Sequence, residues 1–293
     1  MQELTFIKNY KNNEVLRKSF FELAANTFEI DFENWYQHGC WGENYIPFSF
    51  VDGDQVIANA SVNILELIIH GEKKKAIQIG TVMTHPDYRG KGLSTRLMNK
   101  ILEEYDNKYD LMYLFANESV LDFYPKFGFK PVEEHLFSMD YTAKKSPKPA
   151  NIRKLDVANA DDLHLIQKFA LERLPVSQHF GTAHTQGILM FYCLNVFSNN
   201  INYLENENVI VIYQKEDNHI ELFDVVSLNK INMKDILDKI ADEYTETITF
   251  HFTPDATEHL VLKSTLTNEG LFVRSPDEHL YPVQVKHPIT SIA

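Results

Sequence analysis

Apolar residues recur at two spacings along the first half of the chain, and each spacing predicts one kind of element. Spacings of three and four residues are typical of a helix with one buried face, whereas apolar runs rich in β-branched and aromatic residues are typical of strands. The helical windows are 13–27, 93–105 and 118–127. The strand windows are 4–8, 47–51, 55–69, 75–84 and 111–116, with further strands through 141. Residues 28–46 are aromatic but irregular, and no element is predicted there.

The second half repeats this order of elements without repeating the sequence. Its predicted strands are 151–155, 209–213, 220–227 and 247–253, and its predicted helices are 161–171 and 231–244. The fragment 270–273 falls where Gly128-Phe129 falls in the first half. A repeated order of elements predicts two related domains in tandem.

The segment between the two halves has the composition of an exposed linker. Residues 144–150 hold two prolines and three lysines, which continue neither a helix nor a central strand. We therefore predict a domain at 1–143, a linker at 144–150 and a second domain at 151–293. The predicted fold class is mixed α/β, with a central mixed sheet flanked by helices in each domain.

Composition and charge narrow the range of partners. The 293 residues carry a formal net charge of −13 and show no basic face, which argues against a nucleic-acid partner. The excess of carboxylates suits a cationic substrate, or it only keeps the protein soluble. Whether the chain forms homo-oligomers is left open by the sequence.

Cysteine usage and hydropathy favour a cytoplasmic protein. Cys40 and Cys193 lie far apart and form no CxxC pair, which is typical of a reducing compartment. The N-terminus lacks the apolar stretch of a signal peptide, and no run approaches the roughly 20 apolar residues of a membrane helix. His179 and His184 form no complete ligand set, so we expect neither a metal site nor a membrane partner.

A glycine-containing loop between a strand and a helix carries the first chemical signal. Arg89-Gly90-Lys91-Gly92 stands between the strand ending near Thr84 and the helix beginning at Leu93. Backbone N–H groups at a helix start attract an anion, glycines permit its close approach, and Arg89 and Lys91 add positive charge. The loop therefore favours a phosphate site, although a plain strand-to-helix turn can hold the same residues.

Two common phosphate-loop patterns do not fit this segment. The P-loop pattern requires glycine where His85 stands and Ser or Thr where Gly92 stands. The dinucleotide pattern requires a third glycine where Thr95 stands.

A second block makes the prediction more specific. Residues 117–129 read N-E-S-V-L-D-F-Y-P-K-F-G-F, with seven residues from Asn117 to Tyr124. Together with the D-Y-R-G-K-G loop, this block resembles the two signatures of the GNAT superfamily of acetyl-CoA-dependent N-acetyltransferases, Q/R-x-x-G-x-G/A and N-x-x-x-x-x-F-Y-x-x-x-G-F. Asp87 stands where the family usually has Gln or Arg. The resemblance covers residues 77–130 directly and 1–142 by element order.

Within the superfamily, the chain is most similar to tandem-GNAT proteins of the enhanced-intracellular-survival type. The shared features are the run 80–86, the triplet 114–116 and a degenerate second GNAT-like domain. Those proteins usually continue into a domain resembling a sterol carrier protein, which we expect this chain to lack. In that branch the terminal carboxylate takes part in catalysis, and whether Ala293 does so here is left open.

The resemblance implies a site for acetyl-CoA between the strand ending near Thr84 and the strand ending near Ala116. Backbone groups of Val82, Met83 and Thr84 would pair with the pantetheine arm, and the N–H of Val82 would polarise the thioester carbonyl. The residues implied to hold the pyrophosphate are Arg89, Gly90, Lys91, Gly92, Leu93 and Ser94.

Two further residues have a chemical role by resemblance and a structural alternative. Asn117 would hydrogen-bond the pantetheine or thioester end of acetyl-CoA, or it only caps the element that follows. Tyr124 would protonate the departing thiolate as a general acid, or it belongs to an aromatic core with Phe123 and Phe127.

The general base and the acceptor site stay open. The candidates for the base are Glu118, Glu66, Glu43 and His38, or a route through bulk water. The aromatic stretch 28–45, with Trp35, Tyr36 and Trp41, either forms the substrate pocket together with part of the second domain or closes a small core.

The leading hypothesis is acetylation of an amine on a small molecule, for which a polycation is one candidate. Protein or peptide N-acetylation is the second enzymatic hypothesis. A non-catalytic acyl-CoA-binding sensor is the third, because the second half has already lost any glycine loop at 227–232.

Overall fold

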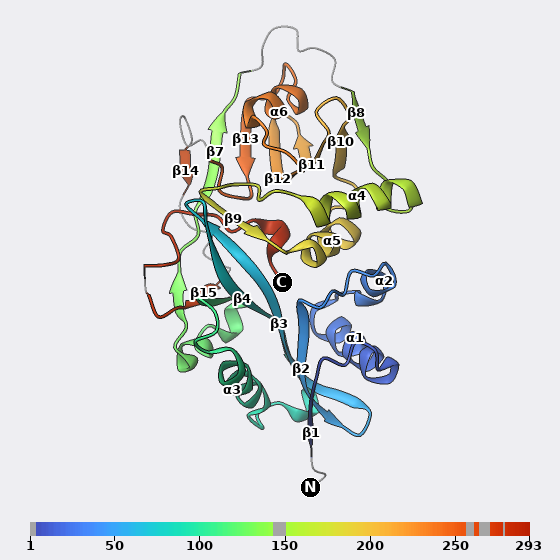
Figure 1. Ribbon diagram of the computed structural model, residues 1–293, viewed down its shortest axis with the longest axis vertical. Helices are drawn as coiled ribbons and strands as arrows, with labels where there is room; N and C mark the ends of the chain where they lie inside the picture. The colour runs from blue at the N-terminus through green and yellow to red at the C-terminus, as the bar shows by residue number, and fades with distance from the viewer. Residues whose placement is uncertain (1–3, 143–150, 256–260, 264–269, 278) are drawn as a thin grey trace.

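The chain folds into two mixed β-sheets with a layer of helices between them (Figure 1). The structure is a computed structural model and describes residues 4–142, 151–255, 261–263, 270–277 and 279–293. The mixed α/β class predicted from the sequence is confirmed, whereas the linker predicted at 144–150 lies outside the described residues.

The first sheet is built mainly from the first half of the sequence. Its strands, in spatial order, are β1 (Thr5–Lys8), β2 (Tyr45–Asp52), β3 (Gln55–Ile69), β4 (Glu72–Thr84), β5 (Leu111–Ala116), β15 (Gly270–Arg274) and β6 (Lys130–Val132). A short strand, β9 (Phe180–Ala183), pairs with the far end of β3. Only the β4–β5 pairing within this described sheet is parallel.

The second sheet repeats the same sequence of strand directions. Its strands, in spatial order, are β8 (Ile152–Lys154), β10 (Ile201–Leu204), β11 (Val209–Glu216), β12 (His219–Ser227), β13 (Thr247–Phe250), β7 (Leu136–Asp140) and β14 (Val261–Lys263). The β12–β13 pairing is parallel, as the β4–β5 pairing is in the first sheet, and the neighbouring pairings are antiparallel.

Each half of the sequence completes the sheet of the other. β15 comes from the second half but lies between β5 and β6, with Phe272 opposite Leu114. β7 comes from the first half but pairs with β13, with Phe137 opposite Phe250. Either half alone would leave the strand edge of its sheet unpaired. The fragment 270–273, assigned by the repeat to the second domain, therefore lies in the first sheet.

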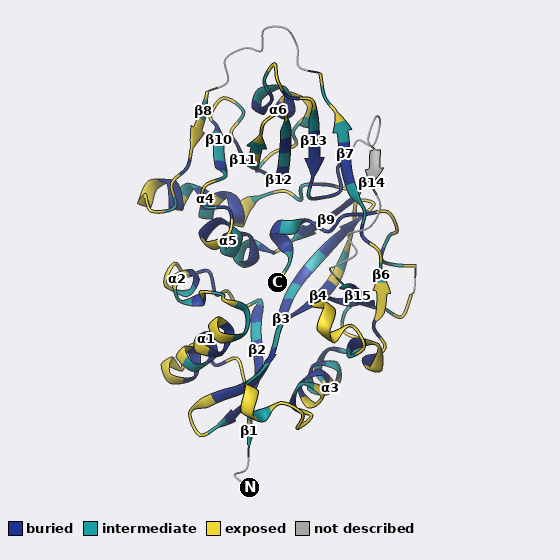
Figure 2. Ribbon diagram, turned by 180° about the vertical axis from the view of Figure 1, so that it is seen from behind, coloured by how far each residue is buried: buried dark blue, intermediate teal, exposed yellow. Residues whose placement is uncertain are grey.

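Helices cover the outer face of each sheet and fill the space between the sheets. The helices are α1 (Glu14–Phe28), α2 (Phe32–Gln37), α3 (Leu93–Tyr105), α4 (Ala160–Glu172), α5 (Gln186–Asn195) and α6 (Met233–Ile240). α3 packs on the outer face of the first sheet and α6 on that of the second. The other four share one core between the sheets, and Figure 2 shows β3 buried along most of its length beside it.

Local sequence explains where the strongest helices begin and end. Asn13 accepts a hydrogen bond from the Leu16 N–H and starts α1, as the helical window from 13 predicted. Gly92 starts α3 in the left-handed region, with φ of 72°. The predicted bounds of α3 and β5 are confirmed to the residue.

The helix predicted at 118–127 is wrong. The segment forms two 3₁₀ turns, η2 (Glu118–Val120) and η3 (Tyr124–Phe127). Pro125 lacks the N–H that an α-helix needs there, and Gly128, with φ of 79°, ends the second turn. The elements α2, α5, β9, β10 and β14 were not predicted, and α6 is shorter than its window.

The C-terminal segment fills an opening in the second sheet. Register pairing of β12 with β13 ends at Leu222 and Phe250. Beyond it, the Ile289 N–H donates to the His251 carbonyl (3.0 Å), and the Thr290 hydroxyl donates to the Asp224 carboxylate. The segment, including the 3₁₀ turn η4 (Ile289–Ser291), then runs on to the first sheet, where the C-terminus lies near the middle of the molecule (Figure 1).

Candidate functional site

The first sheet opens between its two parallel strands. Register pairing of β4 with β5 runs from Ala76–Leu111 to Ile79–Leu114 and then stops, although both strands continue. A pocket of about 330 Å³ lies at this opening, lined by Gly80 to Val82 on one side and by Phe115 to Asn117 on the other. Backbone groups along such an opening can pair with an extended ligand as an added strand would.

A β-bulge on β4 shapes one wall of the pocket. The register with β3 passes from Met83–Asn59 to Gly80–Ser61, so Thr81 and Val82 face a single residue of β3. Thr81 has φ of 51°, in the left-handed region that β-branched residues avoid. A bulge leaves a residue outside the ladder and re-aims its backbone groups. The predicted oxyanion-binding residue, Val82, therefore lies at the point where the ladder is interrupted.

Buried hydrogen bonds hold the bulge from beneath. Asn59, fully buried, donates from Nδ2 to the Thr81 carbonyl (2.9 Å) and accepts at Oδ1 from the Ser49 hydroxyl (2.8 Å). The Ser61 hydroxyl donates to the Tyr45 hydroxyl (2.9 Å), which is 3.3 Å from the Thr81 hydroxyl. These satisfied polar groups fix the backbone around Thr81 and offset the cost of its conformation.

Tyr124 lies in the lining of the same pocket. It is 4% exposed, and its ring contacts those of Phe129 and Phe272. Burial raises the pKa of the Tyr124 hydroxyl to about 12, so the phenol stays protonated at neutral pH. The aromatic packing and a place at the pocket are thus both present, and the first does not exclude a chemical role.

Asn117 also lines the pocket, at the end of β5. It precedes η2 but forms no capping hydrogen bond through its side chain, and the side chain is exposed. The Asn117 side chain therefore does not cap η2. Its amide is available to a ligand in the opening.

The basic glycine loop, residues 89–92, follows the end of β4 and leads into α3. Gly90 and Gly92 have φ of 75° and 72°, and Leu93 packs beneath the helix. Arg89 donates from Nε to the Thr84 carbonyl (3.2 Å). The Lys91 ammonium lies 4.4 Å from the centre of the Tyr88 ring. The glycines are required here because other residues rarely adopt this backbone.

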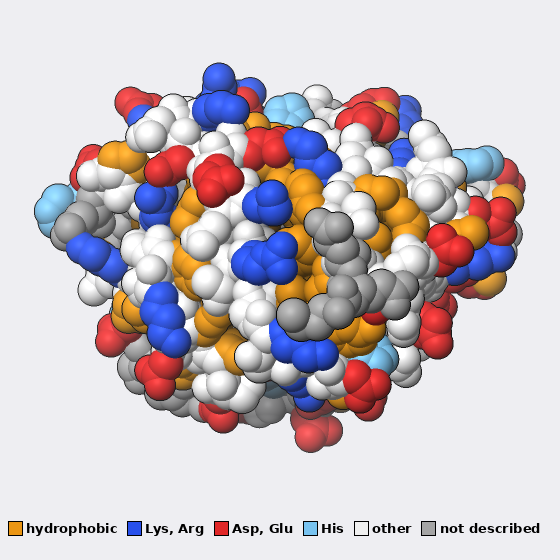
Figure 3. All heavy atoms as spheres, turned by 90° about the horizontal axis from the view of Figure 1, so that it is seen from below, with side chains coloured by type: hydrophobic (Ala, Val, Ile, Leu, Met, Phe, Trp, Pro, Cys, Tyr) orange, Lys and Arg blue, Asp and Glu red, His pale blue; other side chains and the backbone are white. Residues whose placement is uncertain are grey.

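Three more predicted cofactor residues lie near this loop without lining the pocket. The Thr84 and Ser94 hydroxyls are 2.9 Å apart, and the Met83 side chain is buried in the core between the sheets. Seen from below, Lys and Arg side chains lie near the middle of the face, with Asp and Glu side chains among them (Figure 3). Arg89 and Lys91 are both exposed, so anionic groups extending from the pocket toward the start of α3 would meet positive charge at this loop.

Aromatic residues of the first half and α5 of the second half close the pocket together. Phe28, Phe32 and Trp35 line it from one side, and Phe191 lines it from the other. Trp35 donates from Nε1 to the Gly187 carbonyl (2.7 Å), which joins the two halves. Within the aromatic stretch, Trp41 is fully buried in the core, whereas Trp35 is both part of the core and a lining residue of the pocket.

The sequence did not place the last residue at the pocket, and the structure does. A Cβ added to Gly80 would lie 2.9 Å from the backbone C and O atoms of Ala293. Gln78 donates from Nε2 to the Ser291 carbonyl (3.1 Å) and fixes the segment just before it. An isolated glycine inside a strand often marks a close backbone approach, so Gly80 was the available signal.

None of the four candidate bases lines this pocket. His38 lines a neighbouring pocket, and Glu66 lines a hollow that shares four lining residues, His184 among them, with the pocket of His38. Glu43 lies 3.7 Å from the Lys11 ammonium. Glu118 is exposed beside Asn117.

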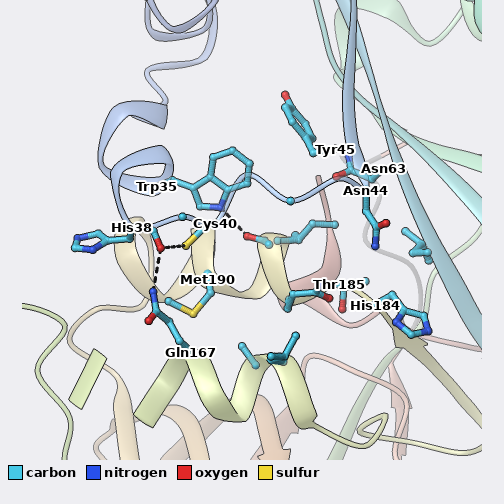
Figure 4. Close-up of a pocket in the computed structure, with 18 of the residues that line it drawn as sticks. Trp35, His38, Cys40, Asn44, Tyr45, Asn63, Gln167, His184, Thr185 and Met190 are labelled. Carbon is cyan, nitrogen blue, oxygen red and sulfur yellow. Dashed lines mark hydrogen bonds between the residues drawn. The ribbon is translucent and has the colours of Figure 1, made fainter. Parts of the chain in front are cut away.

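The neighbouring pocket has a volume of about 400 Å³ and lies between the two halves (Figure 4). It is lined by α2 and the chain after it, by β3, and by α4 and α5. Gln167 on α4 donates from Nε2 to the His38 carbonyl (3.0 Å) across its edge. Trp35, Tyr45 and Asn63 line both pockets, so the two spaces adjoin.

Other sites considered from the sequence are not supported by the described residues. The described residues contain no group of three or more metal-ligating side chains and no helix long and apolar enough to cross a bilayer. Cys40 and Cys193 are buried free thiols whose pKa values are raised by burial.

Comparison with known proteins shows which protein family the residues around this opening resemble. Residues 16–132 match the family model described as "Acetyltransferase (GNAT) domain". Over 88 residues the chain is 33% identical to N-alpha-acetyltransferase 50 of Danio rerio, a match covering 28% of this chain and 51% of that protein. The chain thus spans about half the length of this curated relative.

Solved structures share the fold over nearly the whole chain. A conserved protein from Enterococcus faecalis V583, described as a "Probable N-Acyltransferase", has a TM-score of 0.62 at 18% identity, covering 93% of this chain and 72% of that one. Eis1 from Mycobacterium abscessus has a TM-score of 0.57 at 12% identity, covering 93% and 73%. At these identities the likeness concerns the fold.

The class of protein follows from the domain match and the geometry together. Residues 16–132 match an acetyltransferase domain of the GNAT type, and the predicted site residues Val82, Asn117 and Tyr124 line one pocket.

Proposed function

We propose that the protein is an acetyl-CoA-dependent N-acetyltransferase that acetylates an amine of a small molecule. The observation that carries the proposal is the opening between β4 and β5, where the bulge at Val82, the amide of Asn117 and the hydroxyl of Tyr124 line one pocket. The residues fit the co-substrate, because unpaired strand backbone suits a pantetheine arm and the Arg89–Gly92 loop suits its phosphates.

The chemistry needs an acyl acceptor, an oxyanion donor and a proton donor. A neutral amine nitrogen attacks the thioester carbonyl carbon, and the carbonyl oxygen gains negative charge that the Val82 N–H stabilises. The C–S bond then breaks, and the departing thiolate takes the proton of the Tyr124 hydroxyl, which water later restores. The amine nitrogen then releases its extra proton to water, leaving an amide and free coenzyme A.

The proton on the incoming ammonium requires a base, and described side chains at the pocket offer no carboxylate. Ala293 lies against Gly80 beside the bulge. Where the chain ends at Ala293, its carboxylate is the group we propose for this role.

The two sheets would then be two GNAT-like units with one functional site. The same strand directions support this assignment, with domains at 1–143 and 151–293 that exchange β7 and β15. In the second unit, the opening between β12 and β13 holds the C-terminal segment instead of a ligand. The buried free thiols fit a reducing compartment, and we place the protein in the cytoplasm.

Release of free thiol from acetyl-CoA, measured across a panel of amines and peptides, tests the proposal. We expect release that depends on a small amine, with the acetylated product found by mass spectrometry. Acetylation of peptides only would favour the protein-acetylating alternative. Binding of acetyl-CoA without turnover on any acceptor would favour the sensor.

A further inference from the structure

We infer that the acceptor is a monoamine on an uncharged, apolar or aromatic body that carries a hydrogen-bond-accepting oxygen, and that Asn63 selects it. The inference rests on the proposed function and names the substrate class of that same site. It depends on the way in which the two adjoining pockets are lined.

The two pockets adjoin and share part of their lining. Trp35 and Tyr45 contribute aromatic walls to both, and Asn63 on β3 lines both. Figure 4 shows these three side chains in the larger pocket. Their volumes are about 330 and 400 Å³, within the range of small-molecule sites. The pocket at the bulge receives the acetyl group, so the body of the acceptor occupies the other.

Neither pocket has a charged side chain of Asp, Glu, Lys or Arg in its lining, as far as the described residues show. The polar side chains of the larger pocket are neutral amides, a threonine, a tyrosine and the imidazoles of His38 and His184. A second ammonium group bound inside either pocket would lose water with no carboxylate side chain in the lining to pair with, which is unfavourable. The acidic side chain of Glu66 lies beside the larger pocket, 3.4 Å from His184 Nε2, but outside the lining. The lining therefore favours a single amine over a polycation, although the whole chain carries a net charge of −13.

Asn63 supplies the positive selection. Asn63 is only 6% exposed, and its Nδ2 group has no hydrogen-bond partner among the described residues. Buried amide donors are almost always paired, so an unpaired one that lines a pocket indicates a partner supplied by a ligand.

The neighbours of Asn63 leave this donor to the ligand. Across the sheet it stands in register between Tyr45 on β2 and Gln78 on β4. The Tyr45 hydroxyl is engaged by Ser61, and Gln78 donates to the Ser291 carbonyl and lines neither pocket. An oxygen on the acceptor body is the complementary group within the joined space.

A pair of matched acceptors tests the inference. The thiol-release assay compares 4-methoxyphenethylamine with 4-ethylphenethylamine, in which a methylene group replaces the ether oxygen. Spermidine represents the polycations. We expect the methoxy compound to have the highest kcat/KM and spermidine to show at least a hundredfold less. A higher kcat/KM for spermidine than for either monoamine would overturn the inference while leaving acetyl transfer intact.

The variant Asn63→Leu removes the donor at similar volume. We expect about a tenfold rise in KM for the methoxy compound, little change for the ethyl compound, and an unchanged KM for acetyl-CoA. Because Nδ2 is unpaired in the free protein, the melting temperature should not fall. Equal effects on both monoamines would contradict the role of Asn63, and so would no effect on either. No acetyl-CoA binding by the wild-type protein would instead refute the proposed function.

Discussion

The backbone of Ala293 lies against Gly80 at the residue where the β4–β5 pairing has ended. A Cβ on Gly80 would come within 2.9 Å of the Ala293 C and O atoms. Real Cβ contacts are not that short, so this contact requires glycine at position 80. The C-terminal segment thus reaches from the opening in the second sheet to the opening in the first.

Substituting Gly80→Ala should displace the last residue and lower turnover. We expect a fall in kcat of about tenfold to a hundredfold, because small misplacements at a reaction centre are costly. Removing Ile292 and Ala293 should cause a similar loss, and the combined variant should lose no more than either alone, because both act on one contact.

The control for this pair of changes is Val283→Ala. Val283 is 80% exposed and lines neither pocket, so this variant should keep the wild-type turnover and melting temperature. Independent, additive losses in the combined variant would show that Gly80 and Ala293 do not act together.

Tyr124→Phe should lower kcat by about a hundredfold or more while leaving the Kd for acetyl-CoA within about twofold, because only the proton donor is removed. Steady-state kinetics and calorimetry together make the measurement. Tyr109→Phe is the control, since Tyr109 is a partly buried tyrosine of the same sheet region that lies outside the pocket. An unchanged rate would remove Tyr124 from the mechanism.

Lys91→Ala should weaken acetyl-CoA binding by a few-fold at low salt, because the loop supplies positive charge to the phosphates. The same variant should bind the short thioester S-acetyl-N-acetylcysteamine as the wild type does, since this compound has no phosphate. Equal weakening for both compounds would place the effect of Lys91 in folding rather than in phosphate binding.

Acid should destabilise the protein through His287 in the C-terminal segment. His287 is fully buried beside the hydroxyls of Tyr113 (3.4 Å) and Tyr281 (3.3 Å), and burial, aided by the charge of Lys286, lowers its pKa from 6.5 to about 3. The unfolded state therefore binds a proton that the folded state does not. Stability from this group is complete above pH 6.5 and falls by up to about 1.4 kcal/mol per unit as the pH drops toward 3.

Urea unfolding of the wild type and of His287→Asn between pH 7 and pH 4.5 measures this contribution. The variant should be less stable at pH 7 but should lose less stability on acidification. Parallel pH profiles would show that His287 does not contribute to the acid lability.

Local pattern was sufficient for part of the fold and of the site. The apolar face of α3, preceded by Gly92, fixed the bounds of this helix. The block from Asn117 to Tyr124 marked the pocket through its resemblance to a short GNAT signature. These features depend on neighbours along the chain.

The features that escaped prediction depend on contacts between distant segments. β9 and β15 are short strands whose pairing partners lie more than a hundred residues away, at Leu67 and Leu114. Tertiary pairing of this kind leaves no periodic signal in a four- or five-residue strand. The same applies to Ile188, Phe191 and Ala293. They come from the second half of the sequence and reach the pocket only through packing against the first half.

Isothermal titration of the folded protein with acetyl-CoA tests the central claim most directly. The account predicts saturable binding at one site per chain, competed by coenzyme A and weakened at high salt, because the second opening holds the C-terminal segment. A folded sample that gives no binding heat and shows no shift in melting temperature with acetyl-CoA would contradict it.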